Sequence, residues 1–183
     1  MTTDIPHPVG SGEAVWSWSG PPLLEMTATP MAMPDGGRQT WHLLRAQGGV
    51  TGAVCIASHD DRIVLAQVWR LPVGGESLEL PRGFGDPGED PVTTARRELR
   101  EETGLSADKG VVVGSIYPDT GVMANRVAVV ELRVDLLEGS EGDGELRSWA
   151  WYPVAEVESL VGSGQVVDGL TLAALGLWRA RRG

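Results

Sequence analysis

One segment of the sequence, residues 90–104, constrains the fold more than any other, because it carries a full set of helix signals. Asp90 is a favourable N-cap, Pro91 suits the first helical position, and Gly104 supplies a C-terminal stop. The rest of the pattern predicts strands at 52–58, 62–69, 78–80, 111–117, 126–136 and 146–152, a loop at 82–90, and helices at 153–161 and after Asp168. Strands that alternate with helices predict an α/β fold.

The predicted helix carries three glutamates on one face. Glu98, Glu101 and Glu102 are spaced i, i+3 and i+4, so their carboxylates lie side by side and repel one another. A divalent cation would reverse the sign of that interaction, and oxygen ligands without His or Cys suit Mg²⁺ or Mn²⁺. Arg97 lies four residues before Glu101, where it can pair with it and orient it. The alternative interpretation is a charged, solvated helix face.

The spacing around these glutamates favours the metal interpretation. From Gly83, five residues lead to Glu89, and seven more lead to the run 97–105, RELREETGL. This spacing resembles the signature of the Nudix hydrolases. The resemblance implies a Nudix-type α/β/α sandwich with a mixed central sheet and an extra N-terminal β segment. It also implies a Mg²⁺-dependent hydrolase, with Mn²⁺ as an alternative, that cleaves a nucleoside diphosphate linked to another group.

Roles for individual residues follow from the same resemblance. The metal would be bound by the carboxylates of Glu98, Glu101 and Glu102 and by the main-chain oxygen of Arg82. Arg97 and Glu89 would hold the loop and the helix in register. This assignment agrees with the chemistry, because hydrolysis of a pyrophosphate needs charge neutralisation, an in-line water and a base.

Residues that flank the motif resemble one branch of this family, the ADP-ribose and nucleotide-sugar pyrophosphatases. The similar segments are 67–70, 78–81, 34–41 and 142–145. In that branch, extra N-terminal strands pair two subunits, which implies a homodimer, and an acidic loop closes over the metals. We expect Glu145 to be a further ligand and Asp143 to be the general base, with Glu101 and Glu141 as rival bases. A solvated acidic turn is the alternative for this loop.

Five residues are candidates for substrate contacts. Arg70 lies at a strand end and would contact phosphate, with Arg45 as a weaker candidate. Glu79 would hydrogen-bond a ribose or a water at the metal, or form an ordinary ion pair. Trp41 lies where this branch stacks the adenine, although a tryptophan can equally belong to a core or an interface. Arg82 replaces the alanine common in this branch and would contact the second phosphate or change the leaving-group preference.

Length and composition limit the domain organisation. We expect the chain of 183 residues to have a flexible tail at 1–12, an N-terminal β segment for dimerisation and base binding at 13–48, and a Nudix hydrolase domain at 49–183. The net charge of −10 argues against nucleic acid as a partner, and no apolar run is long enough for a membrane helix. Cys55 is the only cysteine, which excludes an internal disulfide, predicts a buried structural thiol and favours the cytoplasm.

The sequence therefore predicts Mg²⁺-dependent hydrolysis of ADP-ribose or a related nucleoside diphosphate sugar to AMP, or another nucleoside monophosphate, and a sugar phosphate. The loop 118–125 departs from the pattern of the ADP-ribose branch, which leaves the identity of the sugar open. One alternative is hydrolysis of oxidised nucleoside triphosphates or of dinucleotides. A second alternative is a nucleotide-sugar sensor without turnover, which the presence of all three helix glutamates disfavours.

Overall fold

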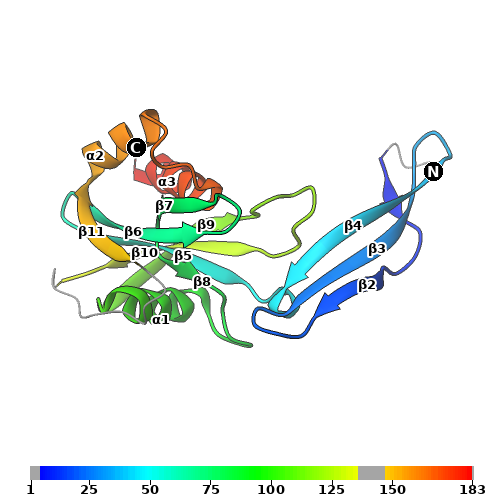
Figure 1. Ribbon diagram of the computed structural model, residues 1–183, viewed down its shortest axis with the longest axis horizontal. Helices are drawn as coiled ribbons and strands as arrows, with labels where there is room; N and C mark the ends of the chain where they lie inside the picture. Colours follow the sequence, from blue (N-terminus) through cyan, green and yellow to red (C-terminus); the bar gives the residue numbers. More distant parts are fainter. Residues whose placement is uncertain (1–4, 136–146, 183) are drawn as a thin grey trace. The chain divides into compact units, whose positions relative to one another are not determined.

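The computed structural model describes residues 5–135 and 147–182, and Figure 1 shows the course of the chain. The strands are β1 (His7–Pro8), β2 (Glu13–Trp18), β3 (Leu24–Ala32), β4 (Arg38–Ala46), β5 (Gly52–His59), β6 (Arg62–Arg70), β7 (Gly75–Glu79), β8 (Arg82–Gly83), β9 (Lys109–Ile116), β10 (Val127–Arg133) and β11 (Ser148–Pro153). The helices are the 3-10 helix η1 (Gln47–Gly49) and the α-helices α1 (Pro91–Thr103), α2 (Val154–Gly162) and α3 (Gly169–Arg182). No helix in the described part of the chain is long and apolar enough to cross a membrane.

The chain divides into two units. The N-terminal unit comprises residues 1–50 and 117–125, and the main unit comprises residues 51–116 and 126–183. The main unit contains a sheet with the strand order β11-β6-β5-β10-β9, to which β7 adds beside β6 and β8 beside β5. Strand β10 runs parallel to β5, whereas the other pairs are antiparallel. The sheet is therefore mixed, as predicted.

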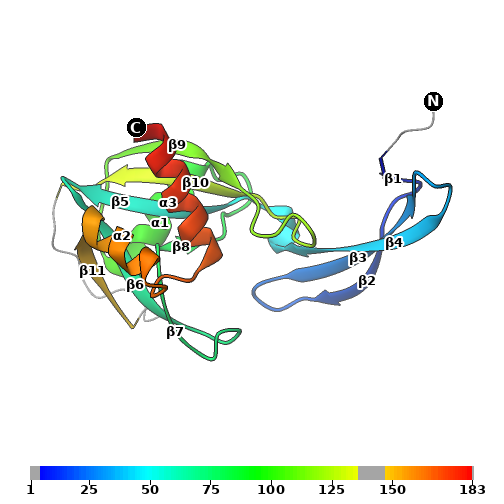
Figure 2. The same ribbon diagram turned by 90° about the horizontal axis from the view of Figure 1, so that it is seen from above.

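Helices cover both faces of this sheet because both faces of β5 are apolar. Successive side chains of a strand point to opposite faces. Cys55 belongs to a buried cluster with Leu99 of α1, whereas Ile56 belongs to a second cluster with Trp178 of α3. Helices α2 and α3 lie over one face and α1 lies over the other (Figures 1 and 2). This arrangement confirms the predicted α/β/α sandwich.

Strand β8 pairs with the part of β5 that lies beyond its pairing with β6. Strand β5 pairs with β6 next to their turn, where Ser58 lies opposite Ile63 and His59 lies opposite Arg62. Beyond them, β8 pairs with residues 53–54 of β5, and the Cys55 N–H donates to the Pro81 oxygen at 2.9 Å. The predicted loop at 82–90 therefore begins as a short strand, because buried backbone groups of β5 need hydrogen-bond partners.

The N-terminal unit is an antiparallel sheet built on β3. Strands β1 and β2 pair with one edge of β3, and β4 pairs with the other. The turn between β3 and β4 contains Asp35 and Gly36, whose φ of 83° favours glycine, and this confirms the predicted hairpin. Residues 7–8, within the expected flexible tail at 1–12, pair with residues 31–32, because β2 leaves this edge of β3 open.

The segment 117–125 belongs to the N-terminal unit, although the sequence analysis assigned it to 49–183. Leu44 of β4 exchanges two backbone hydrogen bonds with this segment, at 2.7 and 2.9 Å. The buried Asn125 side chain accepts from the Ala46 N–H at 2.7 Å and donates to the oxygens of Ala46 and Val50 at 2.8 and 3.2 Å. The Asn125 side chain thus acts as a structural brace that joins this segment to the end of β4 and to Val50.

Candidate active site

Helix α1 begins and ends at the predicted residues. The Asp90 carboxylate accepts hydrogen bonds from the backbone N–H groups of Val92 and Thr93 at 3.0 and 3.2 Å. Gly104 adopts the left-handed conformation, with a φ of 70°, and its N–H donates to the Arg100 oxygen at 2.9 Å. Both caps are local features of the sequence, and they set the register of the functional side chains along the helix.

The three glutamates of α1 differ in depth. The side chains of Glu98 and Glu102 are 13% and 5% exposed, whereas that of Glu101 is 43% exposed. A Cβ atom at Gly83 would lie only 2.1 Å from Cδ of Glu98, so a residue with a side chain would displace this carboxylate. Two carboxylates therefore lie on the inner side of α1, and one of them lies directly against the glycine that opens the motif.

The thiol of Cys55 is buried on the same inner side of α1. Cys55 is fully buried, as predicted for a structural thiol. Burial raises its pKa well above the ordinary value, and the nearby negative charges of Glu102 and Glu98 raise that pKa further. The space between α1 and β5 is therefore electronegative, which favours a cation over an anion as a ligand.

Arg97 connects the loop before α1 with the glutamates. Its Nη1 donates to Oε1 of Glu98 at 2.8 Å and to Oε2 of Glu101 at 3.0 Å. Its Nη2 donates to the Phe84 oxygen at 2.8 Å and to Oε2 of Glu89 at 3.2 Å. One guanidinium group therefore contacts both the loop and the helix, which is the geometry that holding them in register requires.

Glu89 is held in its ionised form within this network. The hydrogen bond from Arg97 is the main cause that lowers the pKa of Glu89 below its ordinary value. The Asp86 N–H and the Thr94 hydroxyl also donate to Glu89, each at 3.0 Å, and lower that pKa further. In return, the Glu89 hydrogen bond raises the pKa of the Arg97 guanidinium. Both groups are charged at neutral pH.

The donor groups of this site suit a hard divalent cation. Carboxylate and backbone oxygens are the ligands that Mg²⁺ and Mn²⁺ prefer, and Glu98 and Glu102 supply carboxylates beside an electronegative interior. No group of three or more His, Cys, Asp or Glu side chains in the described part of the chain is arranged to hold a metal. Instead, Arg97 contacts Glu98 and Glu101. The residues thus fit a divalent cation by the chemistry of their donor atoms. In this structure the positive charge of Arg97 lies between the carboxylates of Glu98 and Glu101.

The predicted acidic loop lies outside the residues that the structure describes. This concerns the expected ligand Glu145, the expected base Asp143 and the rival base Glu141. The other predicted residues of the metal site all belong to the main unit: Arg82 is in β8, and Glu98, Glu101 and Glu102 are in α1.

A second charged cluster brings predicted substrate residues together. Glu79 is 2% exposed and accepts from Nη2 of Arg70 at 2.7 Å and from Nη2 of Arg82 at 2.8 Å. Nη1 of Arg82 also donates to both carboxylate oxygens of Asp168, at 3.1 and 3.0 Å. The sequence analysis missed Asp168 at this site. Its only local signal was its position at the start of a helix, which does not reveal a partner 86 residues away.

The remaining predicted substrate residues, Trp41 and Arg45, lie on β4 of the N-terminal unit. Trp41 is 47% exposed, and its Nε1 donates to Oε1 of Gln39 at 3.1 Å. Nη1 of Arg45 forms an ion pair with Glu25 at 3.1 Å. The described structure therefore distributes the predicted substrate residues over both units.

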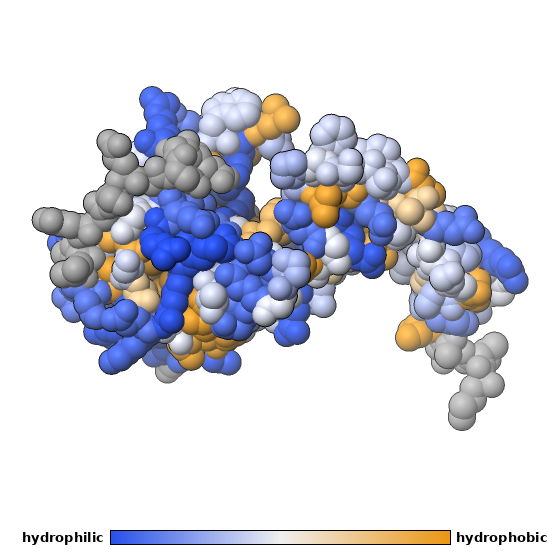
Figure 3. All heavy atoms as spheres, turned by 90° about the horizontal axis from the view of Figure 1, so that it is seen from below, coloured by the Kyte–Doolittle hydropathy of each residue, from blue (hydrophilic) through white to orange (hydrophobic). Residues whose placement is uncertain are grey.

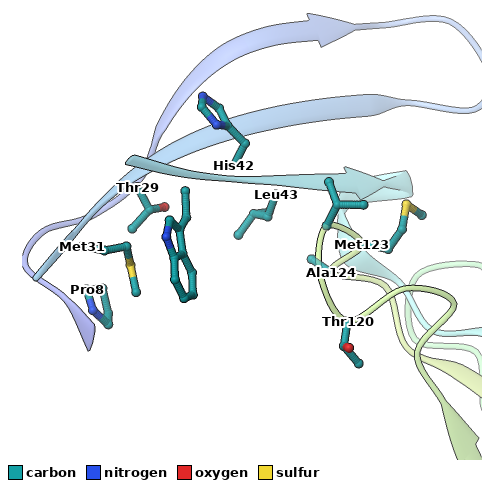
Figure 4. Close-up of a pocket in the computed structure, with 11 residues that line it drawn as sticks. Pro8, Thr29, Met31, His42, Leu43, Thr120, Met123 and Ala124 are labelled. Atoms are coloured by element: carbon teal, nitrogen blue, oxygen red, sulfur yellow. The ribbon is translucent and has the colours of Figure 1, made fainter. Parts of the chain in front are cut away.

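Trp41 lines a cavity of about 330 Å³ within the N-terminal unit. Trp41 and Leu43 alternate along β4 and so point to one face of the sheet, and Thr29 of β3 is the neighbour of Trp41. In Figure 4, Thr29 and Leu43 point into the cavity, whereas His42 points to the opposite side of the strand. Among the residues that the structure describes, the lining contains no Asp, Glu, Lys or Arg and consists of Pro8, Thr29, Met31, Trp41, His42, Leu43 and residues 120–124. This composition suits an uncharged, flat group.

Comparison with known proteins identifies the family. The model of the NUDIX domain matches residues 48–170. The chain belongs to the Nudix family. It is a Nudix hydrolase, an enzyme that acts on phosphoanhydride bonds. The Nudix signature spans Gly83 to Leu105, and therefore contains α1 and the loop that Arg97 connects to it.

Individual Nudix relatives support this assignment. The ADP-ribose pyrophosphatase of Saccharomyces cerevisiae is 33% identical over 113 residues, which are 56% of this chain and 49% of that protein. The ADP-ribose pyrophosphatase of Mycobacterium tuberculosis is 33% identical over 150 residues, 78% of this chain and 70% of that protein. This chain thus spans about half the length of the yeast relative. A crystal structure of an ADP compounds hydrolase matches with a TM-score of 0.78 and 20% identity, over 96% of this chain and 93% of that one, and shows the fold.

Proposed function

We propose that this Nudix hydrolase cleaves the pyrophosphate bond of ADP-ribose or a related nucleoside diphosphate sugar, giving AMP, or the corresponding nucleoside monophosphate, and a sugar phosphate. The cofactor would be Mg²⁺, with Mn²⁺ as an alternative. The observation that carries the proposal is the inward position of Glu98 and Glu102 on α1, with the Glu98 carboxylate against Gly83. The relatives named ADP-ribose pyrophosphatase support the substrate class.

The metal ligands would be the carboxylates of Glu98, Glu101 and Glu102, the main-chain oxygen of Arg82 and the side chain of Glu145. When bound, the cation would neutralise the charge of the diphosphate. Arg97 lies between Glu98 and Glu101 and would keep these carboxylates close together until a cation replaces its positive charge. Together with Glu89, it would also hold the loop 84–89 against α1.

A carboxylate would take the proton from the attacking water. Asp143 is our first choice for this base, with Glu101 and Glu141 as rivals. Among the described residues, Glu101 is the best placed, because its side chain is 43% exposed whereas those of its two neighbours are largely buried. A base must reach a water on the substrate side, and an exposed carboxylate satisfies this need.

Charged and aromatic side chains would make the substrate contacts. Arg70 is oriented by the buried Glu79 and would clamp a phosphate, with Arg45 as a second candidate. Contact of the Arg82 guanidinium with the second phosphate would require it to leave Glu79 or Asp168. Trp41 would stack on the base, a contact worth about 1–3 kcal/mol.

The active form would be a homodimer. The N-terminal unit exposes large apolar side chains, and every residue of β2 is exposed. In Figure 3, hydrophobic side chains lie among polar ones on the surface of the molecule. Among the large apolar residues of this unit, Val15, Trp16, Trp18 and Leu23 are about half exposed. A second copy of the chain would bury them. Light scattering coupled to gel filtration tests this, and a mass of one chain would contradict it.

A turnover screen tests the substrate. ADP-ribose, other nucleotide sugars, dinucleotides and nucleoside triphosphates are each incubated with the full chain and Mg²⁺ or Mn²⁺. We expect ADP-ribose or another nucleotide sugar to be the best substrate, with a nucleoside monophosphate and a sugar phosphate as products. If these are inert while a triphosphate releases pyrophosphate, the proposal is wrong and the triphosphate alternative holds. Binding of a nucleotide sugar without any turnover would identify a sensor.

Replacement of one glutamate tests the metal ligands. Glu102→Gln preserves shape but removes a buried charge, and we expect it to lose turnover and to weaken Mg²⁺ binding measured by calorimetry. Glu156→Gln on α2 is the matched control, since Glu156 is exposed and lies on another helix. Full activity of Glu102→Gln on the best substrate would refute the ligand assignment.

A further inference from the structure

The start of helix α3 is tied to the segment that leads into the Nudix signature. The Leu80 N–H donates to the Thr171 hydroxyl oxygen at 3.0 Å, and this hydroxyl in turn donates to Oδ2 of Asp168 at 2.8 Å. The Thr171 N–H donates to the same carboxylate oxygen at 2.8 Å, so Asp168 also caps α3. Thr171 is fully buried, which means that its hydroxyl has to find these partners within the protein.

Asp168 also contacts the same segment at Arg82, two residues after Leu80. Nη1 of Arg82 donates to both of its carboxylate oxygens, and Nη2 of Arg82 donates to Glu79. The side chains of Arg82 and Asp168 are 20% and 14% exposed, so this pair is poorly screened by water. Leu80 and Arg82 are thus both fixed, directly or through Thr171, to a single carboxylate.

These ties add to the few backbone contacts that hold β8. Strand β8 consists of two residues, Arg82 and Gly83, which pair with residues 53–54 of β5, and the Pro81 oxygen accepts from the Cys55 N–H at 2.9 Å. Gly83 lies against the Glu98 carboxylate, with no room for a side chain between them. A shift of the segment by a fraction of an ångström would therefore move Gly83 relative to Glu98.

We propose that Asp168 is a positioning residue for the hydrolysis. It acts through Arg82 and Thr171, which hold the segment 79–83 so that the main chain before Gly83 and the Glu98 carboxylate keep their mutual geometry. In this role, the Arg82 guanidinium serves the fold of the site and leaves the phosphates to other residues. The inference rests on the proposed function in one respect: it takes the Gly83–Glu98 contact to be part of the reacting site.

Kinetics of three variants test the proposal on the best substrate of the wild type. Asp168→Asn keeps a good N-cap residue but removes the charge that holds Arg82. We expect kcat to fall about 10-fold while KM stays within about 2-fold, because positioning affects the transition state more than binding. Arg82→Met should show the same split. The double variant should lose less than the product of the two single losses, because Asp168 acts in part through Arg82.

The matched control is Glu158→Gln. Glu158 forms an ion pair with Arg179 of α3, so the variant removes a charge contact of the same helix without touching the segment 79–83. We expect wild-type kcat and KM from it, and a melting temperature above that of Asp168→Asn, because Glu158 and Arg179 are about half exposed whereas Arg82 and Asp168 are largely buried. A change in KM alone, additive losses in the double variant, or equal losses in the control would overturn the proposal.

Hydrogen exchange gives a readout that does not depend on turnover. The Leu80 amide should exchange about 10-fold faster in Asp168→Asn, because its acceptor Thr171 loses the charged partner. The amide of Val64, a core residue of β6 on another part of the sheet, serves as the internal reference. Unchanged exchange at Leu80 would overturn the proposed tie. A wild type that turns over no diphosphate would instead refute the proposed function, while the Leu80 exchange would still test the tie.

Discussion

Replacement of Arg97 by methionine should destabilise the main unit, because this side chain joins four groups. It donates to the carboxylates of Glu89, Glu98 and Glu101 and to the Phe84 oxygen. Methionine has a similar length and leaves all four acceptors without this donor. Three carboxylates near one another would then lack the positive charge that lies between them.

The size of the effect follows from the exposure of each pair. The side chains of Arg97 and Glu89 are 23% and 11% exposed, so their contact resembles a buried ion pair, for which loss of one partner costs about 3–5 kcal/mol. Glu101 is 43% exposed, and its pair contributes less than about 1 kcal/mol. Allowing for the partial exposure of Arg97, we expect a loss of about 2–3 kcal/mol, or about 4–12 °C in melting temperature.

The loss should depend on pH. Because Arg97 lowers the pKa of Glu89 in the folded state, the ionised pair stabilises the protein above the ordinary pKa of 4.5. This contribution is lost as the pH falls through the lowered pKa, where Glu89 takes up a proton. The stability difference between wild type and Arg97→Met should therefore be constant near neutral pH and shrink below pH 4.5.

Urea unfolding followed by circular dichroism, at neutral pH and below 4.5, measures both effects. Arg100→Met is the matched control, since Arg100 is an exposed arginine of the same helix, and its variant should unfold close to the wild type. If Arg97→Met were as stable as this control, or if its deficit persisted unchanged in acid, the reasoning would be refuted.

Three further predictions concern single side chains. Gly83→Ala should lower kcat/KM about 100-fold, because the new Cβ displaces the Glu98 carboxylate. Near-ultraviolet circular dichroism checks its fold, and retained activity would contradict the close contact. Cys55 should react with a thiol reagent in the native protein only as fast as the protein opens, and fully after denaturation; rapid native labelling would exclude its burial. Asn125→Ala removes three hydrogen bonds and should destabilise the N-terminal unit by about 2–3 kcal/mol, seen as faster tryptic cleavage at Arg45. Cleavage at the wild-type rate would show that these hydrogen bonds do not stabilise the N-terminal unit.

Much of the main unit could be predicted from the sequence, because its signals are local. The ends of α1 depend on Asp90 and Gly104, which act within one helical turn. The strands β5 and β6 depend on apolar runs that need a buried sheet wherever they occur. The family follows from the spacing of a few residues between Gly83 and Leu105.

The burial of individual side chains could not be predicted from the sequence in the same way. Helical spacing placed Glu98, Glu101 and Glu102 on one face, but only the packing of α1 on β5 and β8 separates two inner carboxylates from an outer one. In α3, the polar Thr171 is buried, whereas the apolar Ala173 is exposed. Periodicity defines neighbours along a helix, and the surface that the helix meets decides which of them are covered.

The sequence by itself determined the family, the α/β/α class and the helix that carries the glutamates, because caps, periods and motif spacing act over short distances. Only the tertiary structure decided that Asp168 joins Arg82, that Arg97 lies between two carboxylates and a loop, and that 117–125 belongs with the N-terminal strands. Such contacts join residues far apart along the chain. They form where two folded elements pack together, and no short stretch of sequence specifies that packing.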